Sequence, residues 1–161
     1  MDFGCFEPVG LVCSIELSTV GQWVYGMYGD FWVYPTILSA HGLGMMTVMG
    51  VVIAFNLRVL GFAKSISINA YDRLFMVGWA GFSLNLVSGL LLLSGAFSTF
   101  IYQGAFLIKI ALIVLGGILL KVVMSGIRSG RDEKVTMLIS AVCLASWVGA
   151  IITGRLMAYL Q

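Results

Sequence analysis

His41 is the residue best suited to do chemistry, and it is the one histidine in the sequence. Imidazole titrates near neutral pH and binds metal ions. His41 lies within the apolar segment 33–57, about 12 Å from its start at a helical rise of about 1.5 Å per residue. Ionisable groups inside such segments usually serve a function, because they are costly there. His41 therefore fits three roles: an axial ligand of haem, a copper ligand, or a proton-transfer group beside a quinone.

A purely structural role for His41 is also open. A neutral imidazole that is hydrogen-bonded to Asn85 or to a backbone carbonyl would be satisfied without any cofactor. Asn85 belongs to a row of small and polar residues on one helical face of the segment 74–95, namely Gly78, Gly81, Asn85, Ser88 and Gly89. Such a face favours helix packing, and it would also accept a flat ligand.

Two basic residues, Lys109 and Arg155, each lie close to one end of a long apolar segment. Either one alone would extend its charge to the lipid headgroups. Together they would hold the propionates of a b-type haem whose iron is bound by His41. Asn85 and Trp147 would then lie beside the macrocycle.

A six-coordinate haem needs a second axial ligand. Met45 lies one turn from His41 on the same helical face, so it cannot reach the opposite side of the ring. A methionine from another helix, a histidine from a second subunit or an open position remains. Met45 instead favours copper as the alternative cofactor, because thioether and imidazole groups suit Cu(I) and Met46 and Met49 are close by. Methionine is also a common apolar filler, so haem is the first expectation and copper the second.

Long apolar segments must position these residues. The sequence of 161 residues is 60% hydrophobic and 10% charged, which is not the composition of a soluble domain. A bilayer is crossed by roughly 20 apolar residues, and four segments meet this length: 33–57, 74–95, 105–124 and 135–158. We expect an all-α, polytopic protein of the lipid bilayer, with a four-helix transmembrane bundle in a single membrane domain. The small surplus of basic residues, 9 − 7 = 2, gives no reason to expect nucleic acid as a partner.

Basic residues predict the orientation of the chain. Residues 1–32 contain acidic but no basic side chains, whereas 58–73 has three basic residues and 121–134 has four. Loops that are rich in Lys and Arg stay in the cytoplasm. Both termini are therefore predicted on the periplasmic side of a bacterial inner (plasma) membrane.

The segment 1–32 also carries apolar and aromatic residues at helical spacing. They predict a short amphipathic helix along the outer interface, where aromatic rings are favoured: Leu11, Ile15, Val20, Trp23 and Val24. Cys5 and Cys13 would share this oxidising side, where a disulfide and two unpaired thiols are both open.

Several strings of the sequence resemble a family of small bacterial four-helix inner-membrane proteins of unknown function. The strings are YPTILSAHGLG, FNLRVLG, GWAGFSLNLVSGLLLL, FLIKIALIVLGG and WVGAIITGRLMAY. The resemblance implies a histidine in the first span, Phe-x-x-Lys in the third and Gly-Arg-x-x-Ala-Tyr at the end, with motif positions His41, Arg58, Lys109 and Arg155. The chain also resembles, more distantly, copper-resistance-D-like and b-type cytochrome membrane proteins, although those usually use several histidines.

Three functions are expected from these observations. The first is a membrane redox protein with b-type haem at His41, which exchanges electrons with quinol or a periplasmic carrier. The second is a non-catalytic accessory subunit that packs against a larger respiratory or photosynthetic complex. The third is a copper-binding or copper-handling membrane protein. A homo-oligomer is open in each case, while a transporter is disfavoured because no Asp or Glu lies within the four segments.

Overall fold

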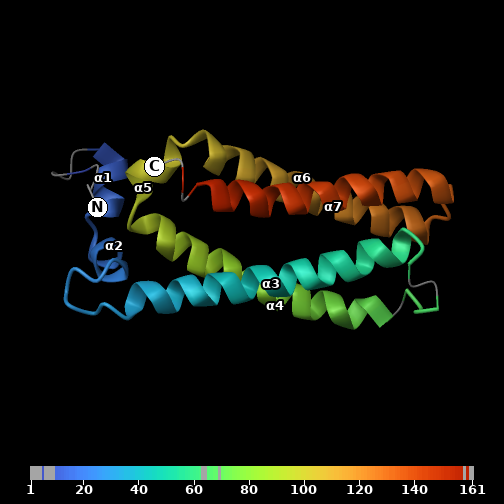
Figure 1. Ribbon diagram of the computed structural model, residues 1–161, viewed down its shortest axis with the longest axis horizontal. Coiled ribbons are helices and arrows are strands. Elements are labelled where there is room, and N and C mark those ends of the chain that lie inside the picture. Colours follow the sequence, from blue (N-terminus) through green and yellow to red (C-terminus); the bar gives the residue numbers. More distant parts are fainter. Residues whose placement is uncertain (1–4, 6–9, 63–64, 69, 158, 160–161) are drawn as a thin grey trace. The chain divides into compact units, whose positions relative to one another are not determined.

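The computed structural model describes residues 5, 10–62, 65–68, 70–157 and 159, and within these residues all regular structure is helical (Figure 1). Four of the helices are long and apolar enough to cross a membrane: α3, α4, α6 and α7. The prediction of an all-helical chain with four such helices is confirmed. The bounds are Gly10–Glu16 for α1, Thr19–Val24 for α2, Val33–Val59 for α3, Ala70–Ser94 for α4, Phe97–Ile101 for α5, Gly104–Arg128 for α6 and Glu133–Leu156 for α7.

Proline and glycine set the ends of the long helices. Pro35 falls in the first turn of α3, where a missing N–H costs no hydrogen bond inside the helix. Gly61 follows the end of α3 with a φ of 101°, and Gly130 follows the end of α6 with a φ of 67°. In both places the glycine and the next residue donate to carbonyls of the last turn, which is the Schellman arrangement.

Helix α4 begins at Ala70, four residues before the predicted segment 74–95, so Asp72 lies in its first turn. The reason is local, because Ala70 and Tyr71 donate to the carbonyls of Ser67 and Ile68 and extend the helix backwards. The carboxylate still lies near the positive end of the helix dipole.

The N-terminal segment contains two short helices rather than the one predicted. Ser18 separates α1 from α2, because its hydroxyl accepts a hydrogen bond from the Gly21 N–H and thereby caps the second helix. Cys5 and Cys13 are joined by a disulfide. Of the two outcomes that were open for these thiols, the structure has the bonded one.

The chain divides into two compact units, each of which is described by itself. Unit 1 comprises Met1–Val48 and Gly78–Gln103, and unit 2 comprises Met49–Val77 and Gly104–Gln161. Unit 1 therefore holds the first part of α3 and the second part of α4, together with α1, α2 and α5. Unit 2 holds the remaining parts of α3 and α4 with α6 and α7.

In unit 1 the N-terminal helices are fixed to the end of α4. The Glu16 side chain is 3% exposed, and its carboxylate accepts the Ser98 backbone N–H at 2.8 Å, in the first turn of α5. Gly21 lies against the backbone of Ser94, and Gly95 lies against the ring of Tyr25, where any side chain would collide. Glycine therefore permits the close approach, and a buried acid satisfies a backbone donor.

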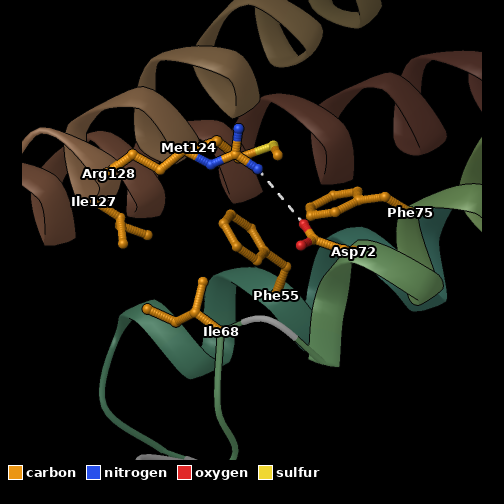
Figure 2. Close-up of a pocket in the computed structure, with 7 residues that line it drawn as sticks. All are labelled: Phe55, Ile68, Asp72, Phe75, Met124, Ile127 and Arg128. Carbon is orange, nitrogen blue, oxygen red and sulfur yellow. Dashed lines mark ion pairs between the residues drawn. The ribbon is translucent and has the colours of Figure 1, made fainter.

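In unit 2 the helices α6 and α7 pack antiparallel through glycine. Gly116 of α6 accommodates the ring of Trp147, and Gly149 of α7 accommodates the side chain of Leu112. Figure 2 shows the other end of this unit, where the rings of Phe55 and Phe75 lie among apolar side chains and an ion pair crosses from α6 to α4. Close backbone approach at small residues is the usual way in which membrane helices associate.

Candidate functional site

The imidazole of His41 is held against α4 inside unit 1. Its Nδ1 lies 3.0 Å from the main-chain carbonyl oxygen of Asn85 and 3.1 Å from the hydroxyl of Ser88. In return, the side-chain amide of Asn85 donates to the main-chain carbonyl of His41 at 2.8 Å. These bonds link the two helices reciprocally and fix the direction of the ring.

The hydrogen bonds also fix the tautomer of His41. A carbonyl oxygen only accepts hydrogen bonds, so Nδ1 must carry the hydrogen. The hydroxyl of Ser88 donates to the Leu84 carbonyl at 2.6 Å, so it acts as an acceptor toward Nδ1. The lone pair of the neutral ring is consequently on Nε2. A histidine that binds a metal is oriented in this way, and so is a structural histidine of the kind that the sequence left open.

Glycine makes room for this arrangement along α3 and α4. A side chain at Gly89 would press on the His41 ring, with its Cβ 3.0 Å from Cε1. At Gly44 the helices are so close that a Cβ would lie 2.7 Å from the backbone nitrogen of Asn85, and at Gly81 it would lie 2.7 Å from Thr47. Within unit 1, the small-residue face of α4 is therefore used for helix packing, and α3 lies where a flat ligand on that face would have been.

The three methionines near His41 differ in their exposure. Met45 is half-buried one turn further along α3. Met46 is exposed, and Met49 is buried as the first residue of unit 2. In the described part of the chain, no group of three or more His, Cys, Asp or Glu side chains is placed to hold a metal ion.

Lys109 crosses from α6 to α7 inside unit 2. The end of its side chain lies over Gly154, where a Cβ would be 3.5–3.6 Å from the last two methylenes and the ammonium nitrogen. Arg155 is the next residue of α7 and is exposed. The Phe-x-x-Lys and Gly-Arg strings of the sequence thus meet at one place, with a glycine receiving the lysine. His41 and Asn85 belong to unit 1, whereas Lys109, Arg155 and Trp147 belong to unit 2.

Trp147 packs on the α6–α7 contact. Its indole covers Gly116, whose Cβ would lie 2.7 Å from Nε1. The indole nitrogen is buried without a hydrogen-bond partner in the described structure. Inside unit 2 the ring therefore has a packing role.

A second buried polar cluster, which the sequence did not reveal, joins α3 and α7 in unit 2. The hydroxyl of Ser140 donates to the side-chain oxygen of Asn56 at 2.6 Å, and the amide of Asn56 donates to the Val52 carbonyl at 2.8 Å. The thiol of Cys143 lies 3.5 Å from the Gly116 carbonyl, as a weak donor. Asn56, Ser140 and Cys143 are each 0% exposed. This cluster satisfies its own polar atoms among three helices.

The partnership of His41 with Ser88 was also missed. Ser88 was identified on the small and polar face of α4, but which residues of two helices face each other depends on their register, which periodicity alone does not give.

Comparisons of the chain with protein-family models, with curated proteins and with solved structures find no match.

Proposed function

We propose that the chain is a multi-pass protein of a bacterial inner membrane that binds a b-type haem through Nε2 of His41. It would exchange electrons with quinol or a periplasmic carrier. The observation that carries the proposal is the pair of hydrogen bonds at Nδ1, 3.0 Å to the Asn85 carbonyl and 3.1 Å to Ser88. They put the lone pair on Nε2, inside a helix long and apolar enough to span a membrane.

A haem supplies reversible one-electron chemistry, and the chain supplies the axial ligand and its orientation. The donor set fits this role at His41, because a hydrogen bond from Nδ1 to a carbonyl makes the imidazole a stronger ligand. The small-residue face of α4 does not fit the macrocycle, because α3 packs on it at Gly44 and Gly81. A macrocycle bound at His41 would therefore not lie on that face of α4.

The proposal places both termini on the periplasmic side. The disulfide between Cys5 and Cys13 supports this, because such bonds persist in oxidising compartments. The basic residues of 58–73 and 121–134 support it too, because they follow the ends of α3 and α6 that would then lie in the cytoplasm. Labelling of Lys134→Cys with an impermeant maleimide in intact cells tests this, and rapid labelling from outside would contradict it.

The experiment for the cofactor is an absorption spectrum of the full chain, purified from haem-replete cells, oxidised and then reduced with dithionite. We expect a Soret band that shifts on reduction and that His41→Ala abolishes. Leu43→Ala is the matched control, because Leu43 is exposed on the same helix two residues away. Added imidazole should restore part of the band in His41→Ala, because it occupies the vacated ligand position.

Other outcomes decide between the remaining functions. Stoichiometric copper that is lost in His41→Ala, without a Soret band, would replace haem by copper. A folded wild-type chain with neither haem nor copper would overturn the proposal. Copurification with a larger complex that His41→Ala does not disturb would then identify an accessory subunit.

A further inference from the structure

We propose that the C-terminal end of α6 binds the headgroup of an anionic phospholipid in a basic groove made by Lys121, Met124, Ser125, Arg128 and Ser129. This groove is shallow and open, and its five lining residues all lie on one side of the end of α6 within unit 2. The inference is independent of any cofactor at His41. It concerns a different unit and a different ligand.

The groove offers the groups that a phosphate diester recognises. Lys121 and Arg128 bring two positive charges to one side of α6, since they are seven residues apart in a helix. Ser125 lies between them and Ser129 beyond them, so that both hydroxyls share that side. All four are exposed, and the Ser129 hydroxyl donates to the Gly126 carbonyl at 3.2 Å. Its oxygen is thereby held in place. Lys121 and Arg128 start about 10 Å apart along the helix axis, and a phosphate between them would contact both long side chains.

The same face of α6 becomes apolar on the membrane side of the groove. From Lys121, steps of three and four residues lead to Ile118 and then to Val114, each 55% exposed. A free phosphate ion would use only the charged end of this face. A phospholipid would use both parts, with its phosphate over Lys121 and Arg128 and an acyl chain along Ile118 and Val114. The occupant is therefore a lipid of the adjoining leaflet.

Arg128 of the groove also pairs with an acidic side chain. Figure 2 shows Arg128 extending toward Asp72, whose carboxylate oxygen lies 3.5 Å from its guanidinium nitrogen. Both side chains are mostly exposed, at 70% and 63%. An exposed pair of this kind is weak, so a lipid phosphate can compete for Arg128. Removal of the carboxylate in Asp72→Asn should therefore strengthen lipid binding.

The test measures binding of phosphatidylglycerol and of phosphatidylcholine to the detergent-solubilised full chain by native mass spectrometry. The wild type should retain phosphatidylglycerol preferentially. The double variant Lys121→Gln/Arg128→Gln should bind it about thirtyfold more weakly, on the scale of about fivefold for each basic residue near an anionic leaflet. Arg73→Gln/Lys134→Gln is the matched control, because it removes two exposed charges of unit 2 outside the groove.

A second variant, Ser125→Glu, keeps both cations and puts a negative charge between them, so it should also reduce binding of phosphatidylglycerol but not of phosphatidylcholine. Equal weakening by the groove pair and by the control pair would overturn the proposal, because net charge alone would then explain the preference. Displacement of phosphatidylglycerol by millimolar inorganic phosphate would overturn it as well, since the site would then recognise a free anion.

Discussion

Two polar links between apolar helices differ in the side chains that form them. In unit 2, Asn56, Ser140 and Cys143 are 0% exposed, and each polar group has a partner on a neighbouring helix or on its own. In unit 1, His41 is half-buried, with Nδ1 directed at α4 by two hydrogen bonds. Both links join helices, but the first consists of an amide, a hydroxyl and a thiol, whereas the second contains an imidazole.

The difference shows how polar residues at membrane depth should be interpreted. An amide, a hydroxyl and a thiol that satisfy one another add modestly to helix association, by about 0.6 kcal/mol per bond on average. An imidazole is, in addition, the commonest metal ligand among side chains. Our proposal therefore differs between the two links: packing for the link of unit 2, and ligand binding in addition to helix contact for the link of unit 1.

The largest expected effect tests whether close backbone contact is what holds His41 in position. Gly44→Ala puts a Cβ 2.7 Å from the backbone nitrogen of Asn85, so α3 and α4 must move apart within unit 1. We expect a loss of about 1–3 kcal/mol in the free energy of unfolding, together with loss of any cofactor bound at His41. Thermal unfolding followed by circular dichroism measures the first effect and the absorption spectrum the second.

Gly42→Ala is the control for this variant, because nothing lies within 4 Å of the added Cβ on the same stretch of α3. It should be neutral or slightly stabilising, since alanine favours a helix over glycine by up to about 1 kcal/mol. Equal destabilisation by the two substitutions would show that the close approach at Gly44 does not hold the helices.

A pair of substitutions with smaller effects sharpens the comparison of the two links. Asn56→Leu removes the bond to Ser140 and should lower the free energy of unfolding by about 0.6–1.7 kcal/mol, without changing a cofactor at His41. Ser88→Ala removes one acceptor of Nδ1 but leaves the Asn85 carbonyl. It should weaken cofactor binding by at most about tenfold, with little change in stability. Denaturation curves and cofactor titration of the same preparations separate the two effects.

The control for Asn56→Leu is the double variant Asn56→Leu/Ser140→Ala. Its loss in free energy of unfolding should be no larger than the sum of the losses in the two single variants, because both substitutions remove the same hydrogen bond. If Asn56→Leu altered cofactor binding, or if Ser88→Ala changed only stability, the assignment of packing to one link and ligand binding to the other would be wrong.

The sequence predicted the long helices better than it predicted which side chains contact one another between them. Four long helices followed directly from apolar length, and His41 was singled out because an imidazole at membrane depth is costly. The facing of Ser88 and Gly89 toward His41 could not be predicted, because it depends on the register of α3 against α4. The cluster of Asn56, Ser140 and Cys143 was missed for the same reason, since its members are 84 and 87 residues apart in sequence.

The break of the N-terminal helix at Ser18 was missed for a different reason. Apolar residues at helical spacing continue through this position, but a serine side chain that caps the next helix competes with continuation of the first. The contact of Lys109 with Gly154 was not predicted either, because the sequence places Lys109 and Arg155 near the ends of their segments but does not give the register of α6 against α7.

The smallest expected effect concerns the N-terminal helices that cover the end of unit 1 near α5. The pKa of Tyr25 is raised to about 12, mainly by burial and to a smaller extent by the neighbouring Tyr34 and the Glu16 carboxylate. Because the pKa in the folded chain exceeds the ordinary value of 10.0, the fold favours the neutral phenol. The corresponding stability is fully present below about pH 10 and is lost as the pH rises through about 12.

Melting temperatures of the wild type and Tyr25→Phe should therefore converge or cross over this range, whereas Tyr102→Phe, at an exposed tyrosine, should follow the wild type. A constant difference between wild type and Tyr25→Phe across the alkaline range would mean that the phenol ionises as freely in the fold as in the unfolded chain, and that the N-terminal helices do not shield Tyr25 from water.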